Sequence, residues 1–193
     1  MTFDYPVFMK LTGVKVLVVG GGQVATRKAE GLFAAGATIT VVAPIIHESL
    51  VELAVECRPR AYVHTDLNGH RLVITATDNP LVNAQVAIDA DAANVWANSA
   101  DDPDNCTFIL PAVARDGAVS VAISTGGSSP ALASHMRAQA QQWLTDLGAA
   151  NAAEMLSQQR AAFHAAGVST ETVDWSQRLL DALRPGRVHS LGD

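Results

Sequence analysis

The sequence predicts an α/β fold whose first part is built around a parallel sheet. Three observations support this prediction. Apolar runs typical of buried strands alternate with helix-like stretches over the first hundred residues. Three consecutive glycines join the first of these runs to the first helix. From Pro130 onward the chain is rich in Ala, Gln and Leu and shows no further strand signal, which is typical of packed helices.

The first part of the chain alternates strand and helix. Strands are expected at 14–19, 38–43, 61–64, 71–76 and 95–98. Helices are expected at 24–35, near 48–55 and from Pro80 onward, and Gly36 ends the first of them as a glycine commonly does at the C′ position. Such alternation is the pattern of a parallel sheet built from right-handed crossovers.

The second part of the chain predicts a hairpin followed by helices. Two apolar runs at 107–113 and 118–124 are joined through the turn residues 115–117. Helices are expected at 130–147, 150–166 and 170–183. We therefore predict a Rossmann-type domain at 1–112, a hairpin-and-helix segment at 113–147 and a helical C-terminal domain at 148–193.

Composition and charge narrow the class of protein. The chain is 49% hydrophobic and 17% charged, which suits a packed core rather than disorder. A net charge of −6 provides no general attraction to nucleic acid or to an acidic membrane, so neither is expected as a partner. No secretory signal or apolar run of about 20 residues is present. The two isolated cysteines, Cys57 and Cys106, fit a reducing compartment, so a cytoplasmic location is expected.

The glycine run fits a dinucleotide fingerprint. Gly20, Gly22 and Ala25 match G-x-G-x-x-A between a buried strand and a helix. Gly20 permits the tight turn, Gly22 lets the backbone approach a pyrophosphate, and the helix N-terminus supplies free N–H groups. The alternative is a glycine-rich turn in an α/β protein that binds no nucleotide.

Two further strand ends face the expected cofactor site. The second strand ends at Pro44 with no Asp or Glu to bind the ribose, so the residues do not separate NAD from NADP. Backbone groups of Pro44 and Ile45 can meet the ribose instead. After the fourth strand, we expect Asp78 to cap the helix that begins at Pro80, and the backbone of Thr77 and Asp78 to line the cofactor.

Two candidate sites for chemistry follow. Asp101 and Asp102 come after the last strand, where a carboxylate beside an apolar crevice can act as a general base; a solvated turn before proline explains them equally well. The loop before Pro130 contains Ser124, Thr125, Gly126, Gly127 and Ser128, which form an anion site at a helix N-terminus. On spacing alone, an ordinary helix start with Ser129 as N-cap is preferred. The six histidines show no clustered ligand spacing, so no metal site is expected.

Several stretches together resemble one known family. They are YPVF at 5–8, VVGGGQVATRKAEGLFAAGATITVVAP at 18–44, ITATDNPLVN at 74–83, the turn at 98–103, TFILPAV from Thr107 and SVAISTGGSSPALA from Ser120. In this order, over about residues 5–145, they resemble the precorrin-2 dehydrogenases of sirohaem biosynthesis, some of which are also sirohydrochlorin ferrochelatases.

The resemblance implies a specific activity. It implies oxidation of precorrin-2 to sirohydrochlorin by NAD, with Asp101 as the general base. It also implies that Gln23, Val24, Pro44 and Ile45 bind NAD, so the missing ribose acid is a trait of the family. The loop at 124–128 is then favoured as the binding site for the carboxylates of the tetrapyrrole.

The resemblance also implies partners and leaves alternatives open. It implies a homodimer formed through the hairpin and the helix at Pro130, which makes 113–147 a dimerisation segment. The residues do not distinguish members that also insert ferrous iron into sirohydrochlorin, nor iron from cobalt, nor whether Thr125 is modified. The alternative class is a regulatory module that binds NAD without catalysis; a chelatase without a redox step is disfavoured by the intact glycine loop.

Overall fold

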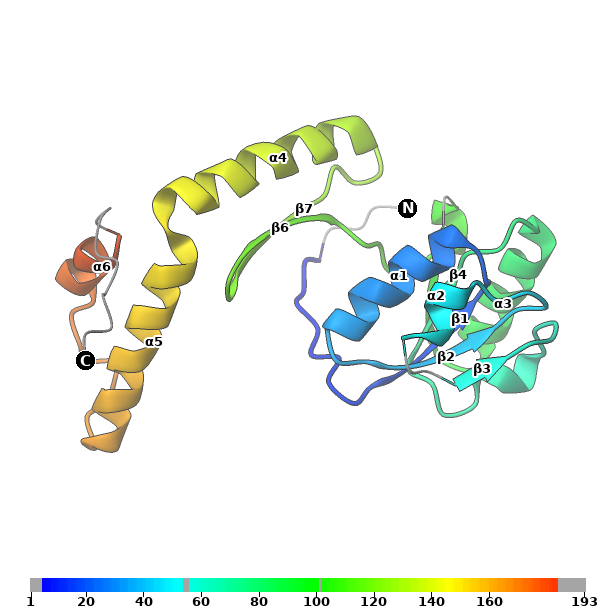
Figure 1. Ribbon diagram of the computed structural model, residues 1–193, viewed down its shortest axis with the longest axis horizontal. Helices are drawn as coiled ribbons and strands as arrows, with labels where there is room; N and C mark the ends of the chain where they lie inside the picture. The colour runs from blue at the N-terminus through cyan, green and yellow to red at the C-terminus, as the bar shows by residue number, and fades with distance from the viewer. Residues whose placement is uncertain (1–4, 54–55, 101, 184–193) are drawn as a thin grey trace. The chain divides into compact units, whose positions relative to one another are not determined.

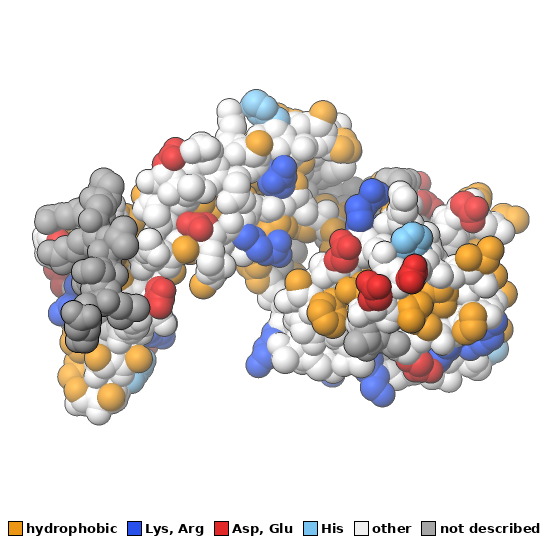
Figure 2. Space-filling model, in the orientation of Figure 1, with side chains coloured by type: hydrophobic (Ala, Val, Ile, Leu, Met, Phe, Trp, Pro, Cys, Tyr) orange, Lys and Arg blue, Asp and Glu red, His pale blue; other side chains and the backbone are white. Residues whose placement is uncertain are grey.

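The computed structural model describes residues 5–53, 56–100 and 102–183. The chain divides between Leu110 and Pro111 into two compact units. Each unit has its own hydrophobic core. The face of the molecule drawn in Figure 2 carries acidic and basic side chains interspersed with apolar ones. None of the helices in the described chain combines the length and the apolar composition of a membrane-spanning segment.

The first unit is built on a five-stranded sheet in which every neighbouring pair is parallel (Figure 1). The strands are β1 (Lys15–Val19), β2 (Thr38–Val42), β3 (Glu56–Arg58), β4 (Leu72–Thr75) and β5 (Trp96–Ser99). Their order across the sheet is β3-β2-β1-β4-β5. The strands β2 and β3 therefore add to one side of β1, and β4 and β5 add to its other side. The prediction of a Rossmann-like parallel sheet is confirmed.

Helices cover both faces of this sheet. They are α1 (Gln23–Ala34), α2 (Glu48–Val51), α3 (Pro80–Ala92) and the 3-10 turns η1 (His64–Leu67) and η2 (Pro103–Asn105). Val16 and Val18 of β1 face the core formed with α1 and α2, whereas Leu17 and Val19 face the core formed with α3 and η1. Because both faces are buried, β1 is apolar throughout instead of alternating, which is why it could be predicted.

One strand lies elsewhere than predicted. We expected a strand at 61–64, but β3 lies at Glu56–Arg58, and His64 begins η1. β3 is a three-residue edge strand that pairs only with β2, so its exposed side accepts polar residues and gives no apolar run. The helix expected near 48–55 is the single turn α2, and residues 54 and 55 lie outside the described part of the chain.

In its described part, up to residue 183, the second unit contains a hairpin and three helices. The elements are β6 (Ala112–Asp116), β7 (Val119–Ile123), α4 (Pro130–Leu147), α5 (Ala149–Ala165) and α6 (Ser176–Ala182). A two-residue turn joins the antiparallel strands, and Gly117 there has a φ of +54°. Ala114 of β6 packs with Leu144 and Ala149 in a small core between the hairpin and the helices.

Two elements of this unit differ from the prediction. The first hairpin strand was expected from Thr107, but Thr107 instead returns to the parallel sheet, where its N–H donates to Ala97 O (2.8 Å) and Ala97 N–H donates to Thr107 Oγ1 (2.8 Å). The third helix was expected at 170–183 but begins only at Ser176. Before it, the indole of Trp175 donates to Thr170 O and packs edge-on against Phe163. The division of this unit at residue 147 stays a prediction.

Candidate functional site

A cavity of about 800 Å³ opens at the carboxyl edge of the parallel sheet. It lies beyond the carboxyl ends of the neighbouring strands β1 and β4, where the strand order switches sides, the position at which open α/β sheets bind ligands. Most of the wall is formed by the loops that follow β1, β2 and β4 and by the segment that follows β3. The lining residues are Val19–Val24, Val42–Ile45, His47, Ala61, Tyr62, Ala76–Asn79, Val82 and Ala100.

The three glycines after β1 serve different structural purposes. Gly20 has a φ of +133°, its N–H donates to Val42 O (3.0 Å), and a Cβ on it would overlap the carbonyl of Ala76. A Cβ on Gly21 would overlap the carbonyl oxygen of Ile45. A Cβ on Gly22 would enter open space, with no protein atom within 4 Å. The first two glycines therefore let three loops meet, and the third leaves room for a ligand.

The N-terminus of α1 is suited to bind an anion. Its N-cap residue is Gly22, which makes no side-chain capping bond, and the first turn contains no acidic residue. Of the other α-helices described in this unit, α2 is capped by the ring of His47 and α3 by the side chain of Asn79. The uncapped N–H groups and the positive end of the helix dipole fit the pyrophosphate of a dinucleotide. The residues present therefore fit the predicted cofactor.

The loop after β4 is held by a residue that the sequence analysis missed. The Oγ1 of Thr77 donates to Asn83 Oδ1 (2.7 Å), and the Nδ2 of Asn83 donates to Thr77 O (3.1 Å). Asn83 is buried under the loop, and Thr77 and Asp78 line the cavity. The prediction that Asp78 caps α3 is wrong, because Asn79 Oδ1 accepts from Leu81 N–H (3.0 Å). The N-cap is thus Asn79, one residue later than predicted, and Pro80 directly after it occupies position N1.

The loop after β2 lies beside the glycines. Pro44 and Ile45 both line the cavity, and Ile45 is 85% exposed. The N–H of His47 donates to Gly21 O (2.8 Å), which joins this loop to the glycine loop. An exposed apolar side chain at the mouth of a cavity provides a surface on which a flat ring can pack.

The turn after β5 begins at the cavity, where Ala100 lines the wall. Asp101, the predicted general base, lies outside the described residues. Cys106 ties the two sides of the turn together: its Sγ accepts from Ser99 N–H (3.1 Å) and lies 3.3 Å from the carbonyl oxygens of Ser99 and Asp102. Burial raises the pKa of the Cys106 thiol, so near neutral pH it stays protonated and donates to these carbonyls.

The loop from Ser124 to Ser129 belongs to the second unit, whereas the predicted cofactor residues belong to the first. Ser129 caps α4 and accepts from Leu132 N–H (3.2 Å), with Pro130 at N1, as predicted. The hydroxyls of Ser124 and Thr125 accept from Gly126 N–H and Ser129 N–H. Gly126 and Gly127 have φ values of +60° and +82° and are exposed. Among the described residues, no group of three or more His, Cys, Asp or Glu could hold a metal ion.

Comparison with known proteins agrees with this geometry. The fold and the cavity define the class of Rossmann-type dinucleotide-binding domains. Residues 7–112 match a family described as putative NAD(P)-binding, and residues 116–139 match one described as sirohaem biosynthesis protein central. Because the first match spans more than half of the chain, the chain belongs to the putative NAD(P)-binding family. This match confirms the prediction that the cofactor is a nicotinamide dinucleotide, NAD or NADP.

The relatives are siroheme synthases. The chain is 48% identical to the enzyme of Tolumonas auensis over 137 residues, which are 69% of the chain and 29% of that protein. It is 46% identical to the enzyme of Azotobacter vinelandii over 146 residues, which are 73% of the chain and 32% of that protein. The chain thus spans about a third of the length of these relatives.

One solved structure is similar over nearly the whole chain. It is described as SirC, precorrin-2 dehydrogenase, with a TM-score of 0.78 and 29% sequence identity. The match covers 94% of the chain and 90% of that protein. The resemblance to the precorrin-2 dehydrogenase family is confirmed.

Proposed function

We propose that the protein oxidises precorrin-2 to sirohydrochlorin with NAD as the oxidant, a step of sirohaem biosynthesis. The observation that carries the proposal is the cavity at the carboxyl edge of the sheet, framed by a glycine loop and an uncapped helix N-terminus. It occurs in a chain that is similar over 94% of its length to a protein described as a precorrin-2 dehydrogenase.

The proposed cofactor residues are those that line this cavity. Gly22, Gln23 and Val24 present backbone N–H groups to the pyrophosphate at the start of α1, and Gly20 makes the tight turn that positions them. The remaining contacts come from backbone groups of Pro44 and Ile45 on one side and of Thr77 and Asp78 on the other. Bound NAD supplies the hydride acceptor of the reaction.

We assign the general base to Asp101. Oxidation of precorrin-2 removes a hydride and a proton, and the carboxylate of Asp101 takes up the proton. The place of this residue in the chain supports the assignment, because it follows Ala100, which lines the cavity. Asp102 is the weaker choice, since its Oδ2 accepts from the side-chain amide of Asn105 (2.6 Å) and thus serves the turn.

The second unit is proposed to bind the substrate. Ser124, Thr125, Gly126, Gly127 and Ser128 precede α4 in a loop at the positive end of the helix dipole, which suits a tetrapyrrole with many carboxylates. We also propose that residues 113–147 form a homodimer interface; the exposed Leu132, Met136 and Trp143 on α4 support this. Insertion of ferrous iron into sirohydrochlorin, a cytoplasmic location and the boundaries 1–112 and 148–193 stay predictions.

An anaerobic incubation with enzymatically generated precorrin-2 and NAD tests the proposal. NADH absorbance and the sirohydrochlorin spectrum should rise together in the unaltered protein. In Asp101→Asn the rate should fall by about two to four orders of magnitude, the usual contribution of a general base, while NADH still binds. The matched Asp102→Asn variant should keep most of the activity. If NAD binds but neither signal rises, a regulatory module without catalysis becomes the better account. A fully active Asp101→Asn would overturn the assignment of the base.

A further inference from the structure

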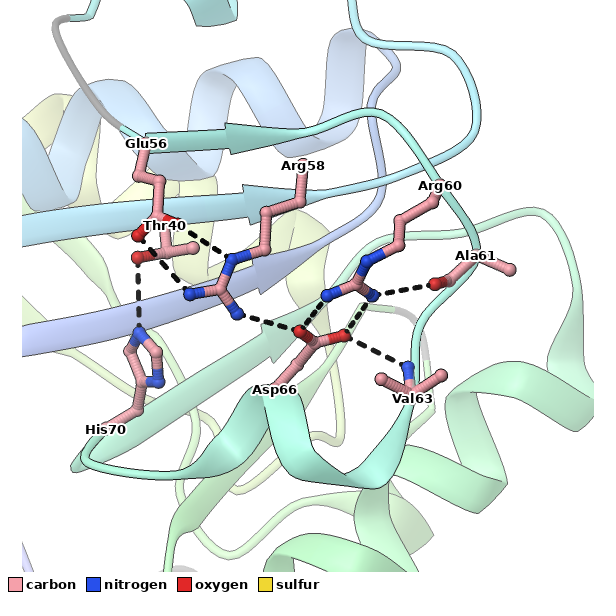
Figure 3. A network of polar contacts seen from close by, with 8 residues as sticks. All are labelled: Thr40, Glu56, Arg58, Arg60, Ala61, Val63, Asp66 and His70. Atoms are coloured by element: carbon pink, nitrogen blue, oxygen red, sulfur yellow. Dashed lines mark hydrogen bonds and ion pairs between the residues drawn. The ribbon is translucent and has the colours of Figure 1, made fainter.

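A buried carboxylate holds two arginines beside the cofactor cavity (Figure 3). The Asp66 side chain is 1% exposed, and Arg58 and Arg60 both donate to it. Arg58 Nη1 lies 2.7 Å from Asp66 Oδ1, while Arg60 binds both carboxylate oxygens, at 2.6 and 2.7 Å. The N–H of Val63 completes the set at 3.0 Å from Oδ2. Hydrogen bonding from Arg60 and the other donors holds the pKa of Asp66 well below its usual range, so the carboxylate stays ionised.

This network is connected to the wall of the cavity. Arg60 Nη1 also donates to the carbonyl oxygen of Ala61 (3.0 Å), and Ala61 and Tyr62 line the cavity together with Pro44 and Ile45. On its other side the wall is held by the Tyr62 hydroxyl, which donates to Asp89 of α3 (3.0 Å). Arg60 and Asp66 thus fix the segment that closes the cavity on the side of β2 and β3.

Arg58 lies next to the strand end that binds the adenosine ribose in Rossmann domains, and Arg60 follows it two residues later in the chain. Arg58 is paired with Val42 at the carboxyl end of β2, and Ala43 N–H donates to Arg58 O (3.3 Å). In this position an acidic residue commonly selects NAD, and an arginine commonly accepts the 2′-phosphate of NADP. Here the end of β2 has no acid, yet two arginines stand on the neighbouring strand and its following loop.

Charge then decides which cofactor fits. The 2′-phosphate adds about two negative charges, and a neighbouring cation that directs its donors at the phosphate stabilises its binding. Among the described residues that line the cavity, none is a lysine or an arginine. The two nearby arginines direct their guanidinium groups to Asp66, and Arg58 also binds Glu56 (2.9 Å).

We propose that Asp66 is a specificity-determining residue: by engaging Arg58 and Arg60 it keeps them from binding a 2′-phosphate, so the protein selects NAD over NADP without an acid at the end of β2. This role rests on the proposed dinucleotide site. It is exerted through the arginines, since Asp66 is buried and does not line the cavity.

Binding of the two reduced cofactors to the unaltered protein and to Asp66→Asn tests the inference. NADH and NADPH are titrated separately and followed by nicotinamide fluorescence, and the ratio of their Kd values is compared. Asp66→Asn is nearly isosteric but removes the negative charge, so the arginines become available. We expect NADPH binding to improve relative to NADH by about tenfold or more, as for one new charge-assisted pair. If Asp66 had only a structural role, the substitution would weaken the binding of both cofactors by the same factor. A ratio of Kd values unchanged within about twofold therefore overturns the inference.

Two further variants keep the test decisive. Asp66→Asn combined with Arg60→Gln should lose most of the gain for NADPH, because the freed cation is removed. Arg60→Gln alone should leave the ratio of the two Kd values unchanged, and this variant can be measured even if Asp66→Asn fails to fold. A selective loss of NADPH binding in Arg60→Gln would mean that Arg60 already contacts the 2′-phosphate, which would overturn the inference. If the unaltered protein binds no NADH, the proposed function itself fails, whereas NADH binding with an unchanged ratio overturns only this inference.

Discussion

Two glycine-rich loops in this protein precede a helix, and both resemble anion sites in the sequence, yet they are built differently. In the loop after β1, Gly20 and Gly21 lie against the carbonyls of Ala76 and Ile45, and no side chain caps α1. In the loop before α4, a Cβ on Gly126 or Gly127 would meet nothing within 4 Å, and Ser129 caps the helix.

The difference separates two reasons for glycine. After β1, Gly20 and Gly21 are required by contacts between loops, and the donors of α1 are left for a ligand. Before α4, Gly126 and Gly127 are required by their positive φ angles. The polar groups of this loop largely bond to one another, since the hydroxyls of Ser124, Thr125 and Ser129 all accept from nearby N–H groups. We therefore expect the first loop to be intolerant of change and specific for the dinucleotide, and the second to be more tolerant.

The largest expected effect is at Gly21. In Gly21→Ala the new Cβ overlaps the Ile45 carbonyl, so the loops after β1 and β2 must separate. We expect the free energy of unfolding, measured by denaturant titration, to fall by about 1–3 kcal/mol or more, and NADH binding to be lost. Gly31→Ala is the matched control, because Gly31 is an exposed residue of α1 with open space around it; there we expect a gain of about 0.5–1 kcal/mol. Equal effects of the two substitutions would contradict the role of Gly21.

A smaller and more selective effect is expected at Gly22. Its Cβ would enter open space, and its φ of −92° is allowed for alanine, so the free energy of unfolding should change by less than about 0.5 kcal/mol. NADH affinity should nevertheless fall by about tenfold, or about 1.4 kcal/mol, because the methyl group occupies space needed by the pyrophosphate. Unchanged NADH binding, measured by calorimetry, would mean that the ligand does not approach Gly22.

The smallest effect is expected at the cap of α4. Ser129→Ala removes the bond to Leu132 N–H and should lower the free energy of unfolding by about 1 kcal/mol, while Ser129→Asn should retain most of it. NADH affinity should be unchanged in both variants, because this loop belongs to the second unit. A drop in NADH affinity in Ser129→Ala alone would show that the two loops do not have separate ligands.

The part of the site that could be predicted from the sequence is the part set by local rules. The apolar run of β1 and the following glycines indicated the cofactor loop because burial on both faces and tight turns restrict the residue types allowed there. Ser129 and Pro130 indicated the start of α4 for the same reason. By contrast, Asp78 and Asn79 are both good capping residues, and only the backbone path decides which one is the N-cap.

Contacts between distant residues could not be predicted in this way. The need for glycine at Gly21 comes from the carbonyl of Ile45, which lies in another loop. Asn83 holds Thr77 from within α3, and Asp66 gathers Arg58 and Arg60, although each of these residues taken alone reads as an ordinary surface residue. β3 escaped prediction because a three-residue edge strand, with Glu56 exposed and Cys57 and Arg58 half-buried, has no apolar pattern.

Hydrogen–deuterium exchange with and without saturating NAD tests most directly the central claim that the dinucleotide binds at the sheet edge. We expect slower amide exchange at residues 20–26 and 43–47, where the loops after β1 and β2 line the cavity, and no change at 124–132. Protection confined to 124–132, or no protection at 20–26 under conditions where NAD binds, would contradict the account.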